Sequence, residues 1–541
     1  MGVKFKAFAL GVIVALGGGP NVNATSPLSP QSCIDNLCAE NFLPRETLNH
    51  WLSLKNEMGP TFAGTPSWQR YMSLIEDEAK KRGMVDFTKN HFIYDNWQTS
   101  MWPDKSKWSF TIGDQRIPVG HYAASAGSTG PDGVTGEMVF VNDWEKAQQT
   151  DLRDKILIVP VKATNLLKNV PDWLYEGHQA AYPVGHEVLP KETVYQDTVS
   201  QLFAANLRGV LGLPKPHLLK KVTDAKPKAV VFAFDMINER VEGLLSYPIP
   251  PIYDIPVLYM GREALTNVQK ILSKKPKQNA TVTLDATIEK TSAYQLTGYL
   301  PGKNYGSQND EIIMMISHTD GPSISQENGP LGLLSMVHYF AQIPQQQRDK
   351  TLMFFLDSRH YIPGREATLP DYNIENVFAE YGALAPLHGR IVASVHLEHL
   401  GQIEYRERNG KYEPTGKAES GSFYVTGYQP IIDIARQALD AYKPENHSLR
   451  TTDLPGIHCQ NQGIWFGLGH WPRRIGVEAI ASTMSFMGAY WGFDTDLSDV
   501  DVDLFERQVN TMTQITAQFM SKDITNLLSV KATQPACKAG Q

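Results

Sequence analysis

The sequence predicts an α/β protein: a three-layer α/β/α sandwich around a mostly parallel mixed sheet, with a small β-rich domain inserted into it. Three observations predict this architecture. Apolar strands alternate with helices after residue 291, short strands and turns fill the region 118–288, and two amphipathic helices precede that region. A chain of 541 residues is also too long for one ordinary core, because domains hold roughly 150 residues each.

The strands after residue 291 are expected to form the central sheet. They lie at Ile312 to Ile316, Thr351 to Leu356 and Ile391 to Leu397. Each is apolar throughout rather than at alternate positions, which is typical of strands covered on both faces. A helix from Leu331 to Ala341 separates the first two strands, and another from Val502 to Met520 closes the domain.

Two helices near the N-terminus are expected to cover this sheet. The first runs from Glu46 to Asn56. The second has a clear start and stop, because Thr65 can cap it, Pro66 suits its first turn and Gly83 ends it. Its apolar side chains recur at helical spacing and are most simply core residues: Trp68, Tyr71, Met72, Ile75 and Ala79.

The β-rich insert is predicted from short apolar strands separated by turns. The run 247–253 is too rich in proline for a central strand and should be a surface loop. The clearest strands are Met138 to Val141, Lys155 to Val159, Ala229 to Phe232 and Ile255 to Tyr259. The expected boundaries are 1–24 for a leader, 25–115 and 291–530 for the two parts of the α/β domain, 116–290 for the insert, and 531–541 for a tail.

Residues 1–24 have the pattern of a secretory signal peptide. Lys4 and Lys6 precede the apolar run Ala7 to Leu16, and small residues at 22–24 form a cleavage pattern. A membrane anchor is the alternative, but the run is well short of the ~20 apolar residues that span a bilayer. We therefore expect a secreted or periplasmic protein with no membrane span.

The four cysteines permit two disulfides, in three possible connectivities. We favour Cys33 with Cys38, which closes a short loop, and Cys459 with Cys537, which would tie down the C-terminal tail. The sequence has no Cys-x-x-Cys pair, which argues against a structural zinc knuckle.

Ionisable residues follow three of the predicted sheet strands, at the point where each strand ends. The ends of neighbouring strands lie side by side, so these groups could converge in one cleft. Imidazole and carboxylate groups together are typical zinc ligands. The alternative is that each is an ordinary satisfied polar group, since titratable clusters are often structural. In strand order the residues are His318, Asp320 and Glu327; Asp357, Arg359 and His360; and His396, Glu398 and His399.

Four segments form a recognisable set: Gly59 to Pro66, Ser317 to Asp320, Gln326 to Gly329 and Leu397 to Gly401. They resemble, in that order, the N-terminal segment, the first His-x-Asp, the segment of the bridging carboxylate and the later acid before a glycine of the family 28 metallopeptidases. These are secreted aminopeptidases and carboxypeptidases with two zinc ions. The resemblance covers most of residues 40–525 and implies that the insert is a protease-associated domain.

The family's catalytic pattern is incomplete in this chain. Its bridging aspartate falls at Glu327 and its later aspartate at Glu398, and either glutamate could still bind metal. Its paired glutamates, a general base and a ligand, should lie within Leu356 to Tyr361, where neither is present. Its last histidine is replaced at Tyr490 or Trp491. The resemblance therefore supports one metal pocket better than two.

The expected ligands of a divalent metal, zinc above all, are His318, Glu327 and Glu398. Asp320 is then expected to hold the ring nitrogen of His318 that does not bind the ion. His470 lies near the place of a family histidine, although a plain loop role is the alternative.

Three further residues are candidates for catalysis. His360 could replace a missing ligand or transfer the proton itself, and Asp357 is a weaker candidate base. Arg359 could favour an anion, either a substrate carboxylate or a developing oxyanion, or it could form a salt bridge with a neighbouring acid.

Two functions are consistent with these residues, and a third is not. The first is an exported metal-dependent hydrolase of a peptide-like or other amide bond, and the second is an inactive peptidase-like binding or scaffolding protein. A metal-independent hydrolase lacks support, since there is no Gly-x-Ser-x-Gly motif and Cys459 is expected in a disulfide.

The net charge of -7 is small for this length and indicates no nucleic-acid partner. Peptides or small amides are the expected substrates, and the oligomeric state is left open.

Overall fold

The computed structural model describes residues 32–142, 147, 149–161, 222, 224–244, 254–362, 390–419, 421–452, 468, 472, 476–485 and 495–532. Across these residues, no helix is both long and apolar enough to cross a membrane. The expectations that lie outside them are the leader at 1–24, the loop at 247–253, the Cys459–Cys537 pair, and the alternatives at His470, Tyr490 and Trp491.

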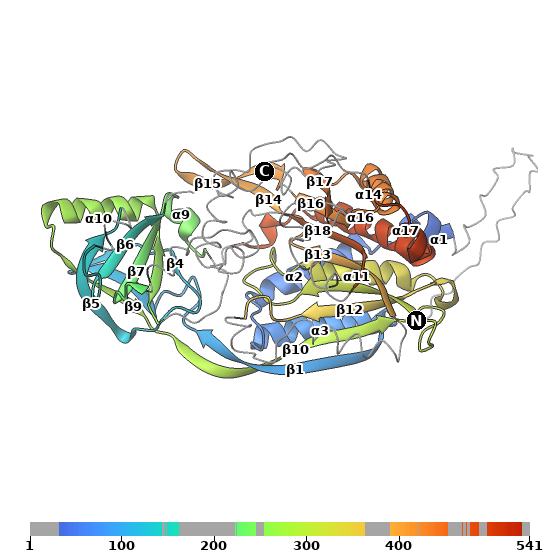
Figure 1. Cartoon of the computed structure of the whole chain (residues 1–541), viewed down its shortest axis with the longest axis horizontal. Coiled ribbons are helices and arrows are strands. Elements are labelled where there is room, and N and C mark those ends of the chain that lie inside the picture. Colours follow the sequence, from blue (N-terminus) through green and yellow to red (C-terminus); the bar gives the residue numbers. More distant parts are fainter. Residues whose placement is uncertain are drawn as a thin grey trace, which may run out of the picture.

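Two eight-stranded sheets dominate the described part of the protein, and Figure 1 shows them side by side. We call them the main sheet and the second sheet. In spatial order the main sheet comprises β1 (Val85–Gln98), β10 (Thr287–Leu300), β12 (Thr351–Asp357), β11 (Glu311–His318), β13 (Arg390–Glu398), β18 (Ala479–Ser485), β16 (Gly421–Thr426) and β17 (His447–Thr452). The second sheet comprises β3 (Gln115–Ile117), β2 (Trp108–Ile112), β9 (Asn279–Leu284), β5 (Gly130–Phe140), β6 (Ile156–Val161), β7 (Ala229–Phe234), β8 (Val257–Met260) and β4 (His121–Tyr122).

The main sheet is mixed. Strand β11 runs parallel to its neighbours β12 and β13, and β13 runs parallel to β18. The β10–β12 and β16–β18 pairs are antiparallel. The predicted α/β fold class with a mixed sheet is confirmed, and each strand predicted after residue 291 falls within β11, β12 or β13.

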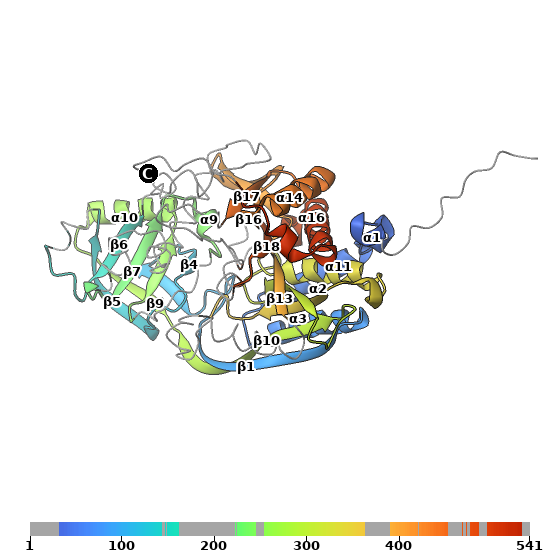
Figure 2. The same ribbon diagram turned by 45° about the vertical axis from the view of Figure 1, so that its right-hand side comes forward.

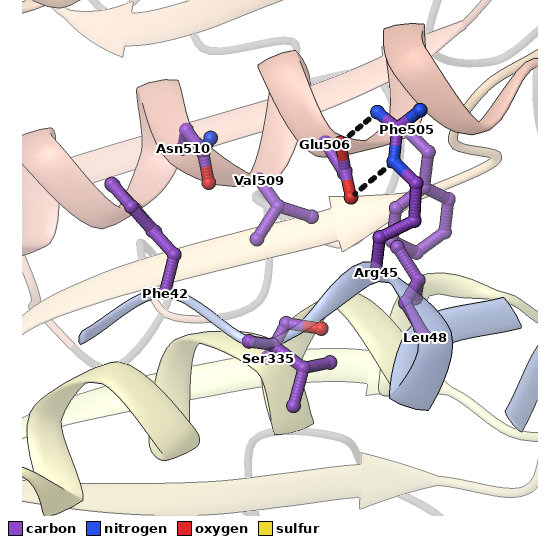
Figure 3. A pocket seen from close by; sticks show the side chains of 9 residues that line it. Phe42, Arg45, Leu48, Ser335, Phe505, Glu506, Val509 and Asn510 are labelled. Carbon is purple, nitrogen blue, oxygen red and sulfur yellow. Dashed lines mark hydrogen bonds and ion pairs between the residues drawn. The ribbon is translucent and has the colours of Figure 1, made fainter. Parts of the chain in front are cut away.

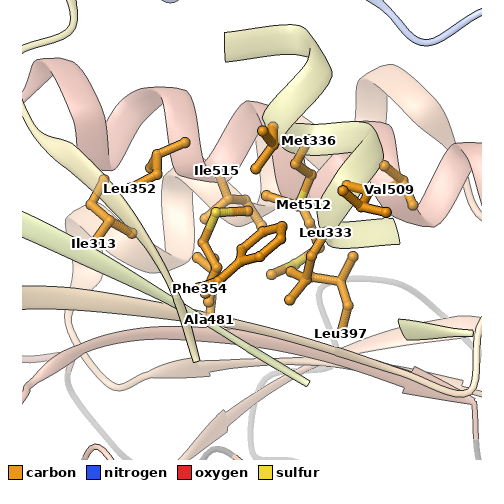
Figure 4. Close-up of a cluster of buried hydrophobic side chains, with 14 of the residues drawn as sticks. Ile313, Leu333, Met336, Leu352, Phe354, Leu397, Ala481, Val509, Met512 and Ile515 are labelled. Carbon is orange, nitrogen blue, oxygen red and sulfur yellow. The ribbon is translucent and has the colours of Figure 1, made fainter. Parts of the chain in front are cut away.

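Helices pack on one face of the main sheet. From β11, Ile313 and Met315 belong to the core that the helices share, and Figure 4 shows Ile313 beside Leu352 on the side of the sheet where α11 and α16 lie. Two of the described helices, α9 (Asn238–Val241) and α10 (Arg262–Lys274), belong to the core of the second sheet. The other described helices are α1 (Ser32–Asp35), α2 (Arg45–Met58), α3 (Pro66–Lys81), α11 (Gly329–Ala341), α14 (Gln429–Tyr442), α16 (Val502–Ser521) and α17 (Ile524–Leu527), with 3-10 turns η1 (Ala39–Asn41), η3 (Gln345–Gln347) and η6 (Leu497–Asp499).

The opposite face of the main sheet is buried as well. Ile312, Met314 and Ile316, which alternate with the core residues of β11, pack with Phe355 and Leu468 in a separate apolar cluster. Side chains alternate between the two faces of a strand, so β11 must be apolar at every position. This is the physical reason for the continuous apolar runs in the sequence.

Helix α3 forms as its sequence signals predict. The Thr65 hydroxyl accepts a hydrogen bond from the Trp68 main-chain N–H (3.3 Å), Pro66 is the first helical residue, and Gly83 adopts a positive φ of 82°. The five apolar side chains of the predicted stripe are buried. The indole N–H of Trp68 also donates to the hydroxyl of Thr319 (3.1 Å), which ties α3 to the loop after β11.

A long two-stranded ribbon connects the two sheets. Strands β1 and β10 pair from Val85 opposite Tyr299 to Gln98 opposite Thr287. In β1, Tyr94 belongs to the core of the main sheet, whereas Trp97 belongs to that of the second sheet. Figures 1 and 2 both show the ribbon curving from one sheet to the other. The polypeptide thus enters and leaves the second sheet through adjacent strands, as an inserted unit requires.

The second sheet begins before the expected boundary at residue 116. Its strand β2 starts at Trp108, which is opposite Leu284 in β9, and Trp108 and Phe110 are fully buried in its core. The early start follows from sheet pairing, which a composition-based boundary does not detect. The assignment of this unit to the protease-associated domains stays a prediction.

A hairpin reaches from the main sheet to the second sheet. It consists of β14 (Ile403–Arg408) and β15 (Lys411–Ala418), and Figure 1 shows β15 close to α9. The Arg262 guanidinium of α10 pairs with the Glu407 carboxylate (2.8 Å), and the Arg240 guanidinium lies 4.7 Å from the centre of the Tyr412 ring. These contacts attach the second sheet to a segment that follows β13 directly.

The predicted Cys33–Cys38 disulfide is confirmed. The Tyr339 hydroxyl of α11 donates to the Cys33 carbonyl (2.6 Å) and accepts from the Cys38 main-chain N–H (2.8 Å). The small disulfide loop is therefore held against the helical face of the main sheet.

We expect His121 to make the second sheet sensitive to acid. Its ring is fully buried and stacks on Tyr122 with 4.2 Å between ring centres, and burial lowers its pKa to about 3. The unfolded chain binds a proton below about pH 6.5 that the folded chain excludes, so stability falls as the pH drops from about 6.5 toward 3. Between pH 7 and pH 5 this site should remove about 2 kcal/mol of unfolding free energy.

Urea unfolding of His121→Phe at pH 7 and pH 5 tests this, because phenylalanine keeps the ring stack and cannot titrate. The variant should lose less stability than the wild type between the two pH values, whereas His50→Gln, at an exposed histidine, should lose as much. Equal losses in His121→Phe and the wild type would contradict the assignment.

Candidate functional site

Three neighbouring strands of the main sheet deliver ionisable side chains to one edge. Within the parallel register, His318 at the end of β11 lies opposite Asp357 at the end of β12. On the other side Ile316 lies opposite His396, so Glu398 at the end of β13 reaches the level of His318. The predicted convergence of strand ends is thus present in the structure.

Three of these side chains form a compact set of metal-binding atoms, which we call the His-Glu-His cluster: His318, Glu398 and His399. Their candidate ligand atoms all lie within 4.8 Å of one another. The Nε2 atoms of the two histidines are 3.4 Å apart. The Glu398 Oε2 lies 3.8 Å from the His318 Nε2 and 3.9 Å from the His399 Nε2. The residues are only 0%, 1% and 3% exposed, respectively.

His399 joins this cluster because the chain turns sharply at that residue. In a continuing strand, Glu398 and His399 would point to opposite faces of the sheet. His399 instead adopts a φ of 50°, a conformation that residues other than glycine rarely take. The sequence places His399 at the strand end, but its only signal for this role is the following Gly401, which also has a positive φ (70°).

Asp320 supports His318 through its main chain. The Nδ1 of His318 lies 3.1 Å from the Asp320 carbonyl oxygen, which can only accept, so Nδ1 carries the proton and Nε2 is left as a ligand atom. The Asp320 carboxylate accepts from the main-chain N–H groups of His360 (3.1 Å) and Tyr361 (2.6 Å). Its side chain thus holds the loop after β12, rather than the ring as predicted.

Glu327 was expected as a metal ligand, and the structure gives its carboxylate a different partner. The Glu327 Oε2 lies 2.9 Å from the ammonium of Lys55 in α2, and both side chains are completely buried. Lys55 also donates to the Gly59 carbonyl (3.1 Å). The charge of Glu327 is therefore balanced within the protein.

Gln326 faces the cluster in place of its neighbour. The Gln326 side-chain nitrogen lies 2.8 Å from the Nε2 of His399, and the residue is 1% exposed. The amide nitrogen can only donate, so this hydrogen bond uses the Nε2 lone pair of His399, and an ion bound at that atom would replace the Gln326 contact. Gln326 was not among the residues predicted from the sequence, because an amide is a weaker signal of metal chemistry than a carboxylate.

The candidates after β12 divide into two groups. The Asp357 Oδ1 accepts from the Arg359 Nε (2.7 Å) and from the Gln295 side chain (3.0 Å), so Arg359 forms the salt bridge that was its alternative role. The ring of His360 stacks on that of His318, with 4.2 Å between ring centres and 17° between planes. His360 is partly exposed, so it lies at the outer side of the buried cluster.

Burial alters the protonation of the cluster in a consistent direction. It lowers the pKa of His318 to about 4 and that of His399 well below the usual value. Burial raises the pKa of Glu398 to about 7, although a hydrogen bond from the Leu468 main-chain N–H opposes this. A divalent cation binds neutral imidazoles and ionised carboxylates. At this cluster the imidazoles are already neutral, and the charge of the cation would stabilise the ionised form of Glu398. The residues present therefore fit a metal ion.

A separate pocket of about 270 Å³ lies among the helices. Figure 3 shows its lining from α2, α11 and α16, with Arg45 at one side hydrogen-bonded to Glu506. Arg45 also pairs with Asp503, so two carboxylates already balance its charge. The pocket is not part of the strand edge that carries the His-Glu-His cluster.

No protein-family model matches the sequence, and no curated protein matches it. Solved structures do match in fold. A peptidase M28 precursor from Shewanella amazonensis is similar at 13% identity and a TM-score of 0.58, over 94% of this chain and 99% of that one. An aminopeptidase from Aneurinibacillus sp. strain AM-1 is similar at 13% and 0.54, over 94% and 100%. A zinc aminopeptidase from Bacillus subtilis is similar at 13% and 0.54, over 89% and 98%. The chain therefore has the fold of these peptidases.

The Lys55–Glu327 pair should be costly to break. Lys55→Met leaves the buried Glu327 carboxylate without its partner, which should lower the free energy of unfolding by about 3–5 kcal/mol. Arg45→Met is the matched control, because it removes a half-exposed cation from its ion pairs and should cost less than about 1 kcal/mol.

Urea unfolding of both variants, and of Lys55→Met combined with Glu327→Gln, measures the pair. The double variant should recover part of the stability, since no buried charge is left unpaired. A loss in Lys55→Met as small as that in Arg45→Met would show that the pair is not a buried charge balance.

Proposed function

We propose that this protein is a metal-dependent hydrolase of the metallopeptidase type, which cleaves a peptide-like or other amide bond. The observation that carries the proposal is the convergence of His318, Glu398 and His399 within 4.8 Å at the carboxyl edge of the main sheet. The fold shared with zinc aminopeptidases supports the same class of reaction. A peptide or a small amide is the corresponding substrate.

The His-Glu-His cluster is the proposed site of one divalent ion, zinc above all. Two imidazoles and one carboxylate are a donor set of catalytic zinc sites, which keep a further position for water or substrate. Bound zinc would supply a Lewis acid that polarises the substrate carbonyl and lowers the pKa of an attacking water. The Lys55 ammonium already balances Glu327, which supports one ion rather than two.

We assign proton transfer to His360. Its stacked position on His318 brings it next to the cluster, and its partial exposure gives it access to substrate and solvent. Asp357 is less suited to act as a base, because its Oδ1 accepts from both Arg359 and Gln295. A positioned imidazole is a common proton-transfer group in hydrolases.

A peptidase-like binding protein without turnover is the second candidate. The observation that favours it is the burial of the cluster, whose three residues are at most 3% exposed, since hydrolysis requires that substrate reaches the metal. The second sheet would then serve to hold the partner.

We propose export from the cell on the basis of the leader at 1–24, to the periplasm or the exterior. The inserted position of the second sheet between β1 and β10 supports its role as a protease-associated-like domain.

Elemental analysis and a substrate screen test the hydrolase directly. We expect elemental analysis to find one zinc ion per chain. The substrate screen compares peptides that are blocked at one end, either the N-terminus or the C-terminus, and we expect turnover of one of these two kinds. His318→Ala should lose both the ion and turnover, because it removes a ligand. His360→Ala should keep the ion while turnover falls about 10²- to 10⁴-fold, because it removes only proton transfer.

The matched control is His91→Ala, at an exposed histidine of β1, which should keep both properties. A wild-type protein that binds no divalent ion at saturating zinc would rule out the metal mechanism, and full activity in His318→Ala would reject this site. One bound ion without turnover of any peptide would favour the binding protein.

A further inference from the structure

We propose that Asn328 is a positioning residue for the metal site, because its side-chain amide holds the turn that directs His399 toward His318 and Glu398. The inference rests on the proposed function, since positioning matters only if the His-Glu-His cluster binds an ion.

The Asn328 side-chain amide makes two hydrogen bonds with the main chain of Leu400. Its Nδ2 donates to the Leu400 carbonyl and its Oδ1 accepts from the Leu400 N–H, each over 2.8 Å. Asn328 is completely buried, so no water competes for these bonds. Two opposed hydrogen bonds fix both the position and the orientation of Leu400, the residue that directly follows His399.

The residue is not used as a helix cap, although it stands where one is expected. Asn328 precedes the first residue of α11, and asparagine is among the preferred residues for capping a helix N-terminus. Its side chain makes no capping hydrogen bond there and turns to Leu400 instead. The amide is therefore committed to the turn after β13.

The turn needs this support because its backbone is unfavourable. A φ of 50° at His399 persists only where the surroundings enforce it. Two other contacts act in the same direction. The Gly401 N–H donates to the Gln508 side chain (2.7 Å), and the Ser485 N–H donates to the His399 carbonyl (3.3 Å). Without the Asn328 bonds the turn could relax toward an extended strand, which would take the imidazole away from Glu398.

The test compares Asn328→Ala with Thr351→Val. Thr351 is also fully buried, and its hydroxyl bonds Asp310 (2.8 Å) and the Gly302 N–H (3.1 Å). It lies at the start of β12, whereas Asp357, at the level of the site, ends that strand. Thr351→Val therefore removes comparable buried hydrogen bonds at the far end of the same sheet. Two quantities are measured for each variant. The first is the zinc affinity, by calorimetry at a temperature well below the melting temperature. The second is the melting temperature of the protein after a chelator has removed its metal.

We expect both variants to lower the melting temperature of the metal-free protein, and only Asn328→Ala to weaken zinc binding, by about 10- to 100-fold. Thr351→Val should bind zinc within twofold of the wild type. Equal zinc affinity in Asn328→Ala, Thr351→Val and the wild type would overturn the positioning role, even though the wild type binds zinc.

If Asn328→Ala does not fold, Asn328→Asp supplies the comparison, because it keeps the side-chain size and the acceptor for the Leu400 N–H. It should also weaken zinc binding, since its carboxylate would face the Leu400 carbonyl without a donor, and wild-type affinity in this variant would overturn the role. A wild type that binds no zinc would instead overturn the proposed function, and the positioning role with it.

Discussion

Parallel pairing of β11 with both of its neighbours is the constraint on which the site depends. The pairing sets His318 level with Asp357 on one side and brings the end of β13, with Glu398, to the same edge. Both faces of these strands are buried, so a slip of one residue would reverse the facing of every apolar side chain and is strongly opposed. The candidate ligands at the ends of β11 and β13 thus stand on rigid elements.

The carboxylates buried at this edge are stabilised in different ways. Glu327 pairs with an ammonium, Asp357 with a guanidinium, and Asp320 accepts two main-chain N–H groups. Glu398 accepts one main-chain N–H and lies beside two imidazoles that burial keeps neutral. Burial raises the pKa of Glu398 to about 7, as it raises the pKa of Glu327 to about 7 and that of Asp320 to about 8. Of these carboxylates, Glu398 is the one that lies with both imidazoles, so it is the one whose charged form an ion at the cluster would stabilise.

The turn after β13 connects this chemistry to the rest of the molecule. His399 and Gly401 lead into the β14–β15 hairpin, which pairs with the second sheet through Glu407 and Tyr412. The side chains of Asn328, which precedes α11, and of Gln508 in α16 accept hydrogen bonds from main-chain N–H groups of the same turn. The site and the helical layer therefore meet at this turn, and the hairpin that follows it makes the contacts with the second sheet.

The sequence by itself predicted the fold class, the three central strands of the main sheet, the helices α2, α3, α11 and α16 and the arrival of His318 and Glu398 at one edge, and it favoured the Cys33–Cys38 pair, because periodicity, capping and strand ends are local properties. It did not predict the outer strands β1, β10, β16, β17 and β18 or helix α14. Only the tertiary structure decided the partners of the buried charges. Lys55 continues the helical stripe of Leu48, Trp51 and Leu52, so the sequence places its position on the buried face of α2. The sequence does not reveal the partner of its ammonium, because Glu327 is remote from Lys55 in the chain. The tertiary structure also decided the place of His399, since a left-handed residue forms where contacts from other elements outweigh its backbone cost, and such contacts leave no pattern in the sequence around it.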